Sequence, residues 1–225
     1  MSFSPLIITD QRRGTTFQIS TVNGTSSKIT DEIMSLPPVN IDYITFSGRG
    51  EPTLAANLGE MIKAARKIRQ EKIAVITNSS ILCRKDVTDD LLPADCVVAK
   101  LDAYSQKSLD EINRPMEGIT FSGIVNSMRE FRQKYKGKFA IQIMFMKVNK
   151  KHAVEIAKIV RSIKPDEVQI NTPLRKCGVK PLPKTEIDKI KKYFAGIDII
   201  SVYDVKKKEI ESISKKDTLR RRGKI

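Results

Sequence analysis

The chain of 225 residues is long enough for one domain with a substantial hydrophobic core. It lacks tryptophan and has no apolar run of membrane-spanning length, which argues against a membrane protein and makes the cytoplasm the expected location. The net charge of +15 permits binding to an anionic partner such as RNA, although a high charge also keeps a protein soluble.

The first 40 residues have the least regular pattern and form a separate N-terminal segment in our interpretation. Two extended stretches, Leu6–Ile8 and Thr16–Val22, are candidate strands, and the turn dipeptide Asn23-Gly24 follows the second one. Ile29 and Ile33 are four residues apart, which is a helical spacing, so we expect a helix here. Two prolines end this helix.

The next stretch predicts a buried strand that runs into a glycine turn. Tyr43–Phe46 is β-branched and aromatic, and Ser47–Pro52 follows it with the sequence Ser-Gly-Arg-Gly-Glu-Pro. The missing side chains of Gly48 and Gly50 let a ligand approach the backbone. The turn fits neither a dinucleotide-binding fingerprint, because Thr53 replaces the third glycine, nor a P-loop, which needs a Gly-Lys-Ser/Thr ending.

Residues 41–204 alternate between strands and amphipathic helices. Strands are expected near 43–47, 73–77, 96–101, 139–146, 167–171 and 197–203. Asn57 with Glu60, and Thr185 with Asp188, predict the N-terminal caps of two of the helices. Near-continuous apolar strands between helices predict parallel βαβ units, and hence an α/β fold with an incomplete parallel barrel. Residues 205–225 form a basic tail that we expect to be loosely packed.

Polar residues follow the strands. They are Ser47 to Glu51, Asn78 to Ser80, Lys100 and Asp102, Lys147 and Asn149, and Asn171 and Thr172. The carboxyl ends of parallel barrel strands surround one mouth, which is where such folds bind ligands. Strands end in polar loops in any case, so roughly half of these residues are expected to have no role. We predict that Glu51, Asn78, Asp102, Lys147 and Asn171 line one concave face.

Several segments in order resemble a known family. They are Ile44–Leu54, Ile76–Ser79, Lys100–Asp102, Ile112–Pro115 and Val168–Pro173. Together they are similar to an uncharacterised group of prokaryotic radical S-adenosylmethionine (radical SAM) iron–sulfur oxidoreductases, related to the tRNA wyosine-synthesis enzymes. The glycine turn itself resembles the Gly-Gly-Glu-Pro motif of that superfamily, with Arg49 inserted between the glycines. On those six residues alone, an ordinary βα turn with two structural glycines is an equal alternative.

The resemblance implies a partial (βα)6 barrel with S-adenosylmethionine at its mouth, bound to a [4Fe-4S] cluster that reduces the cofactor to a 5′-deoxyadenosyl radical. The residues that it assigns to cofactor binding are Gly48, Gly50, Glu51, Pro52, Asn78, Ser79, Asp102 and Asn171. The first four match the motif that binds the amino group of the cofactor's methionine. Asn78 and Ser79 lie at a strand end that would face the cofactor. Asp102 and Asn171 would contact the ribose and adenine sides of the cofactor, or the substrate.

The cysteines depart from the family pattern. The superfamily holds its cluster with a Cys-x-x-x-Cys-x-x-Cys loop, but the only cysteines here are Cys83, Cys96 and Cys177. An odd, widely spaced set suits neither a disulfide framework nor a metal site, so we predict isolated thiols and no metal ligands. Gly14–Ser20 nevertheless resembles the segment that follows the third cysteine of the family loop.

The leading hypothesis is therefore a truncated or degenerate radical SAM protein. A misassigned start or a frameshift, a decaying gene, and a remnant with a new binding role are three explanations for the missing loop. Without the family's first strand, Tyr43–Phe46 becomes a sheet edge that residues 1–30 are candidates to cover. One alternative is a non-catalytic RNA-binding α/β domain that contacts RNA, such as tRNA, through its basic surface. A metal-independent (βα) enzyme is a weaker alternative, because the lone His152 stands at an expected exposed helix start.

Overall fold

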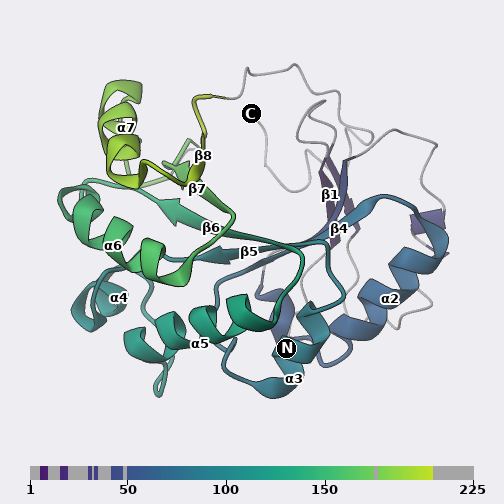
Figure 1. Cartoon of the computed structure of the whole chain (residues 1–225). Helices are drawn as coiled ribbons and strands as arrows, with labels where there is room; N and C mark the ends of the chain where they lie inside the picture. Colours follow the sequence, from purple (N-terminus) through teal and green to yellow (C-terminus); the bar gives the residue numbers. More distant parts are fainter. Residues whose placement is uncertain are drawn as a thin grey trace. The chain divides into compact units, whose positions relative to one another are not determined.

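The computed structural model describes residues 6–9, 16–19, 30–31, 33–34, 42–47, 50–174 and 177–204. These residues divide into two compact parts, one up to Val75 and one from Ile76 onward. The positions of the parts relative to one another are not determined, so each part is taken by itself (Figure 1). The predicted basic tail and Gly48 lie outside the described residues.

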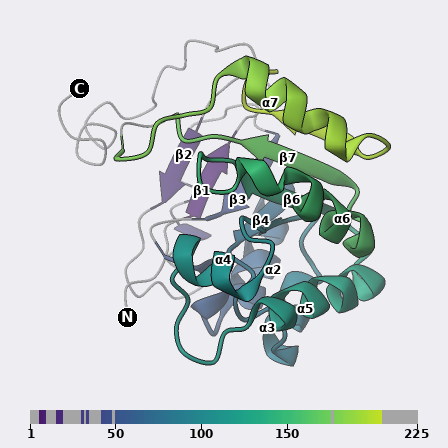
Figure 2. The ribbon, with the colours of Figure 1, turned by 90° about the vertical axis from the view of Figure 1, so that its left-hand side faces the viewer.

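The first part contains four neighbouring strands in the order β2, β1, β3 and β4 (Figure 2). Their bounds are Leu6–Thr9 for β1, Thr16–Ile19 for β2, Tyr43–Phe46 for β3 and Lys72–Thr77 for β4, which continues into the second part. Strand β1 is antiparallel to β2 and to β3, whereas β3 and β4 are parallel. The N-terminal segment therefore covers the edge of β3, as the sequence predicts.

The connection from β3 to β4 consists of the 3-10 helix η1, Pro52–Leu54, and helix α2, Leu58–Ile68. Helix α2 buries the predicted apolar face, including Leu58, Ile62 and Ala65. The predicted N-cap residue at its start, Asn57, is confirmed, but the capping bond that a capping box assigns to its side chain is absent. The preceding turn of η1 already brings the chain into the helix, with the Leu58 N–H donating to the Ala55 carbonyl at 3.1 Å.

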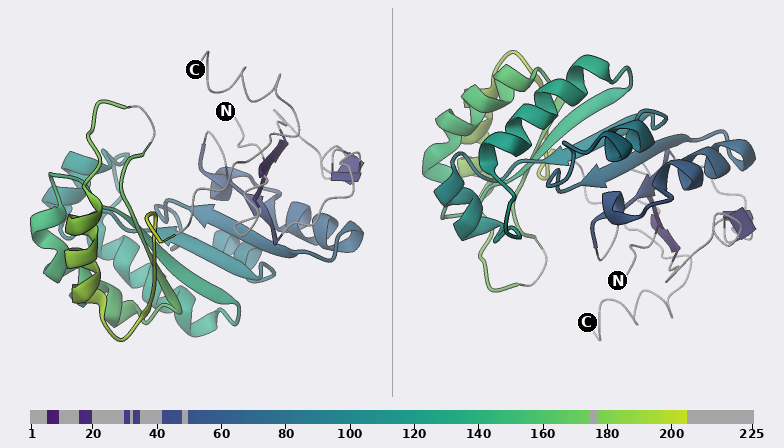
Figure 3. Two further views of the ribbon diagram at one scale, coloured as in Figure 1. Left: turned by 90° about the horizontal axis from the view of Figure 1, so that it is seen from above. Right: turned by 90° about the horizontal axis from the view of Figure 1, so that it is seen from below.

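The second part consists of parallel strands covered by helices. Strands β5 (Cys96–Lys100), β6 (Lys138–Met144), β7 (Glu167–Asn171) and β8 (Asp198–Ser201) pair in this order, each parallel to the next. The helices are α3 (Lys85–Leu91), α4 (Gln106–Ile112), α5 (Phe121–Lys134), α6 (Ala153–Ile163) and α7 (Lys184–Lys191), with the 3-10 helices η2 (Lys150–His152) and η3 (Lys192–Phe194). They lie on one side of the strands (Figure 3). The predicted α/β fold with parallel strands is confirmed.

Successive side chains along the strands of the second part point to opposite faces of the sheet. The side chains that face the helices are fully buried: Val97, Ala99, Phe139, Ile141, Ile143, Val168 and Ile170. On the helix-free face, Val98 and Ala140 are also buried, whereas the polar side chains of Lys100, Gln142, Gln169 and Asn171 nearer the carboxyl ends of the strands are half-buried. One face of this sheet is therefore a hydrophobic core, and the other can hold polar chemistry.

In the second part, a side chain caps the starts of α4 and α5, whereas α3, α6 and α7 have no side-chain cap hydrogen bond. Ser105 and Thr120 cap α4 and α5 by accepting from the Ser108 and Gly123 N–H groups at 3.2 and 3.1 Å. The predicted cap at Thr185 is wrong. Helix α7 begins one residue earlier, after Pro183, and Asp188 instead accepts from the ammonium of Lys184 at 2.7 Å. Within the described ranges, no helix is both long and apolar enough to span a membrane.

Candidate functional site

The chain leaves β4 through a tight polar turn that contains the predicted residues Asn78 and Ser79. The Asn78 Oδ1 accepts from the Ser80 N–H at 2.9 Å, and the Thr77 Oγ1 accepts from the Ser79 N–H at 3.0 Å. Ser79 has a φ of 67°, in the left-handed region that a non-glycine residue occupies at an energetic cost. It is buried, and its hydroxyl lies 3.5 Å from the Lys100 carbonyl. The turn is thus held by local bonds that leave Asn78 exposed.

Asp102 joins the carboxyl end of β5 to β6. Its side chain is 4% exposed, and the Oδ1 accepts from the Met144 N–H at 2.7 Å. The other carboxylate oxygen has only long contacts, 3.4 Å from the Lys100 Nζ and 3.4 Å from the Asn113 Nδ2. One carboxylate oxygen therefore bonds to the backbone, and the other has long contacts that a ligand hydroxyl could replace.

Asn149 completes this junction. It is fully buried, and its Nδ2 donates to the carbonyls of Asp102 and Met144 at 2.9 and 3.0 Å. Its Oδ1 accepts from the Met146 N–H at 2.8 Å. One amide side chain thus satisfies three backbone groups from the segments that follow β5 and β6. We call Asp102 and Asn149 together the strand-end clamp.

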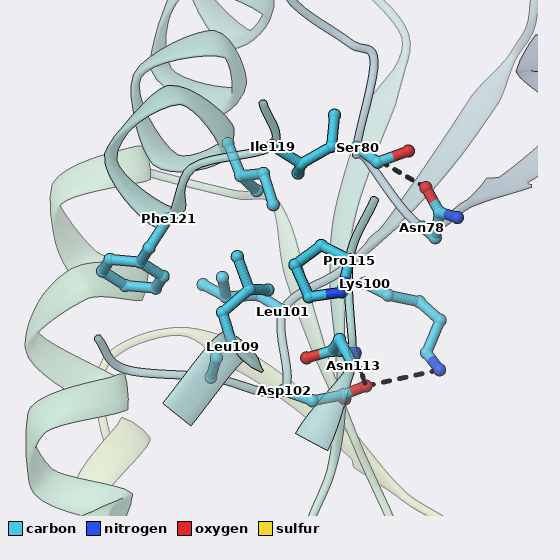
Figure 4. A pocket seen from close by; sticks show the side chains of 12 residues that line it. Asn78, Ser80, Lys100, Leu101, Asp102, Leu109, Asn113, Pro115, Ile119 and Phe121 are labelled. Atoms are coloured by element: carbon cyan, nitrogen blue, oxygen red, sulfur yellow. Dashed lines mark hydrogen bonds and ion pairs between the residues drawn. The ribbon is translucent and has the colours of Figure 1, made fainter. Parts of the chain in front are cut away.

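A pocket of about 120 Å³ lies beside the clamp (Figure 4). It is lined by Asn78, Ser80, Lys100, Leu101, Asp102, Ala103, Leu109, Asn113, Pro115, Ile119, Phe121 and Ile124. The polar side chains come from the ends of β4, β5 and α4, and the apolar wall comes from α4, α5 and the segment between them. This volume is below the roughly 300 Å³ of the smallest drug-sized sites, so the pocket suits part of a ligand.

The segment between α4 and α5 forms the rim of the pocket. Arg114 has a φ of 47° and Gly118 a φ of 85°, so the chain turns sharply at both places. The side-chain oxygen Oε1 of Gln106 accepts from the Phe121 N–H at 2.7 Å and fixes the start of α5. Met116, in the middle of the segment, is 84% exposed. Backbone hydrogen bonds from the Arg114 N–H to the Leu109 carbonyl and from the Ile119 N–H to the Met116 carbonyl, both 3.2 Å, help to hold Pro115 and Ile119 at the pocket.

The glycine turn belongs to the first part. The Glu51 side chain is the N-cap of η1, where one carboxylate oxygen accepts from the Thr53 N–H at 3.2 Å and from the Thr53 hydroxyl at 2.7 Å. Pro52 is buried as the first residue of η1, and Gly50 is exposed. The glutamate of the motif therefore stabilises the turn itself. The structure does not test whether Glu51 shares a face with the residues of the second part.

The remaining predicted positions are in the second part. Asn171 ends β7 on the helix-free face, where its carbonyl accepts from the Phe145 N–H at 2.8 Å and its side chain is half-buried. Lys147 is exposed after β6 and does not line the pocket. Asn78 and Asp102 are the two members of the predicted face that the pocket brings together. None of the pocket residues Asn113, Leu109 and Phe121 was predicted to be a site residue. Asn113 nevertheless lies within the Ile112–Pro115 segment of the family resemblance.

The cysteines do not form a ligand set. Cys83 and Cys177 are exposed, and Cys96 is buried at the start of β5. Burial raises the pKa of the Cys96 thiol to about 11, which disfavours the thiolate that a metal requires. In the part of the chain that the structure describes, no group of three or more His, Cys, Asp or Glu residues could hold a metal ion. His152 stacks on Tyr104 with ring centroids 3.9 Å apart, which gives this histidine a packing role.

The chain is similar in sequence to longer proteins. It is 38% identical over 191 residues to the GTPase Obg of Brachyspira hyodysenteriae, a match that covers 80% of this chain and 28% of that protein. It is 34% identical over 170 residues to a UPF0026 protein of Methanocaldococcus jannaschii, with 74% of this chain and 53% of the relative covered. The chain therefore spans about half the length of the UPF0026 relative, and it contains no P-loop motif of its own. No family model matches it.

The fold is similar to those of solved radical SAM enzymes. SuiB of Streptococcus suis, bound to S-adenosylmethionine, has a TM-score of 0.63 at 13% identity, and the match covers 81% of this chain and 44% of SuiB. A radical SAM methyltransferase from Sphaerobacter thermophilus has a TM-score of 0.62 at 15% identity, with coverages of 81% and 58%. At these identities the likeness shows the fold. The predicted incomplete (βα) barrel of the radical SAM type is therefore confirmed.

Replacing the buried amide of the strand-end clamp is expected to destabilise the second part strongly. Asn149→Ala leaves the Met146 N–H and two carbonyls without partners in a buried place, so the free energy of unfolding should fall by about 2–4 kcal/mol. Asn126→Ala is the matched control, because Asn126 is exposed and its amide oxygen accepts from half-buried Arg129 at 2.9 Å. Its effect should stay within about 0.5 kcal/mol. Urea unfolding followed by circular dichroism measures both, and equal effects would contradict the clamp.

Proposed function

We propose that the second part binds the nucleoside moiety of S-adenosylmethionine in the pocket beside Asp102, and that the chain is a radical SAM-type barrel without cluster ligands of its own. The observation that carries the proposal is the pairing, in one pocket, of an apolar wall with a carboxylate oxygen that has only weak partners. The likeness of the fold to an S-adenosylmethionine-bound enzyme supports the choice of cofactor.

The pocket suits a nucleoside because it is apolar on one side and polar on the other. Leu109, Ile119 and Phe121 offer a surface on which a flat base can pack (Figure 4). On the polar side, the Asp102 oxygen whose contacts with Lys100 and Asn113 are 3.4 Å long can accept from ribose hydroxyls. The same negative charge favours the sulfonium cation of the cofactor. Asn78 and Asn113 add amide groups at the two ends of the polar side.

The other predicted cofactor contacts have different kinds of support. The assignment of Gly48, Gly50, Glu51 and Pro52 to the amino group of the cofactor rests on the sequence motif. The Glu51 carboxylate is engaged with Thr53, so we assign that contact to the backbone of the turn. The assignment of Asn171 to the adenine or ribose side of the cofactor, or to the substrate, stays a prediction. The buried hydroxyl of Ser79 is assigned to supporting the turn.

The residues of this chain do not fit the cluster of the family. Three thiolates within a short loop would hold three irons and leave the fourth for the cofactor. Here two of the three cysteines are exposed at separate places, and the third is buried with a raised pKa. We therefore assign no radical step to these residues, and propose a binding role for the pocket. RNA binding through the basic surface stays an alternative prediction, and many of its lysines and arginines lie in residues 205–225, outside the described part.

The carboxylate of Asp102 is expected to decide the affinity for S-adenosylmethionine. Asp102→Asn keeps an oxygen for the Met144 N–H but removes the negative charge from the pocket, so Kd should rise about 10- to 100-fold. Asp110→Asn is the control, since Asp110 is an exposed carboxylate on α4 and bonds only to Gln106. Isothermal titration calorimetry gives both values, and thermal unfolding checks that the variants fold. Equal affinity in Asp102→Asn and the wild type, or no binding by the wild type, would overturn the proposal.

Anaerobic reconstitution tests the assignment of the cysteines. With iron and sulfide supplied, the 225-residue chain should hold substoichiometric iron and release no 5′-deoxyadenosine from S-adenosylmethionine, because its cysteines do not converge. Iron analysis and chromatography of the nucleoside products are the measurements. A content near the roughly four irons of a complete cluster, together with the cleavage product, would show that the cysteines are wrongly placed.

A further inference from the structure

A row of polar side chains crosses the helix-free face of the second part. Lys100 of β5 is the register partner of Gln142 on β6, and Gln142 is the partner of Gln169 on β7. All three side chains are half-buried, whereas the neighbouring helix-facing positions are closed to solvent. A sheet face that served only as core would carry apolar side chains at these places. We call these three residues the polar row.

Glu167 fixes the direction of the hydrogen bonds along the row. Its carboxylate is buried and accepts from the ammonium of Lys138 at 2.5 Å and from the Gln169 Nε2 at 2.9 Å. An ionised carboxylate only accepts, so Gln169 must turn its NH2 group toward Glu167 and its oxygen toward Gln142. The Gln142 Nε2 then donates to the Gln169 Oε1, at 3.0 Å. Both amides are thus oriented by the buried carboxylate of Glu167.

This orientation leaves the row rich in donors. Each amide NH2 has two hydrogens, and each uses one of them within the row. The ammonium of Lys100 has three hydrogens, and its one ion-pair partner in the described part of the chain is Asp102, at 3.4 Å. The unused donors come from adjacent strands on one face, where half-burial makes each one costly to leave without an acceptor.

We propose that the polar row binds a carboxylate group of the substrate, with Lys100 as the counter-ion and Gln142 and Gln169 as neutral donors. This inference rests on the proposed function, because it names the chemical class of what would lie beside the cofactor pocket. A singly charged carboxylate suits the row better than a phosphate dianion. The row has one cation, and the Glu167 and Asp102 carboxylates close to it would repel a second negative charge. Lys100 also lines the cofactor pocket, so it connects the two surfaces.

The side-chain amide signals of Gln142 and Gln169 report on the row directly. In the full chain labelled with nitrogen-15, we expect succinate, which can place one singly charged carboxylate group in the row and keep its second carboxylate in solvent, to shift both signals saturably at constant ionic strength. Succinamide, which has the same length without charge, should produce no saturable shift, and inorganic phosphate should bind more weakly than succinate. No saturable shift with succinate, or tighter binding of either comparison ligand, overturns the proposal.

Variants separate recognition from folding. Gln142→Glu places a negative charge in the row, so the Kd for succinate should rise at least about tenfold. Gln142→Met removes the hydrogen-bonding groups at similar volume and should weaken succinate binding less. Gln133→Glu, on the exposed face of α5, carries the same charge change and should leave the Kd unchanged. Equal effects of Gln142→Glu and Gln133→Glu would show that only net charge matters and would overturn the proposal.

The affinity for S-adenosylmethionine, measured on the same samples, keeps the two proposals apart. Gln142 does not line the cofactor pocket, so Gln142→Met should bind S-adenosylmethionine as the wild type does. If the wild-type chain binds S-adenosylmethionine but not succinate, the polar row alone is contradicted, and if it binds succinate but not S-adenosylmethionine, the proposed function alone is contradicted. Displacement of succinate by S-adenosylmethionine would assign the row to the cofactor's own carboxylate and overturn the inference.

Discussion

The hydrogen bond from the Met144 N–H to the Asp102 carboxylate is the contact on which the candidate site depends. It ties the end of β5 to β6 at the point where the two strands stop pairing. Asn149 then satisfies the carbonyls that the same junction exposes. A buried junction of this kind tolerates little movement, because each of its polar groups would lose a partner. The polar side of the pocket is therefore preorganised before any ligand arrives.

The helix-covered face of the sheet contributes stability, and the helix-free face carries the groups that we propose for recognition. Under the helices, residues such as Phe139 and Ile141 are closed to solvent and supply hydrophobic free energy. On the helix-free face, the Lys138–Glu167 ion pair orients the amides of the polar row. Lys100 stands where the polar row and the pocket meet. In our proposal, a cofactor and a substrate would thus be bound by neighbouring groups on one sheet.

Much of the fold could be predicted from the sequence because it depends on local periodicity. The bounds of β7 and the cover that β1 gives to β3 follow from apolar alternation and from the need to protect an edge. The roles of individual site residues were harder to predict. Asp102 was assigned to a ligand, yet one of its oxygens bonds to a strand 42 residues further along the chain. Gln142 and Gln169 were missed, because only the register reveals that they are neighbours.

A crystal structure of this chain with bound S-adenosylmethionine tests the central claim most directly. The account predicts that the base packs against Phe121 and Ile119, and that a ribose hydroxyl lies within about 3.2 Å of the Asp102 Oδ2. The Met144 N–H should keep its bond to the other carboxylate oxygen. A cofactor bound elsewhere, with this pocket holding only solvent, would contradict the account.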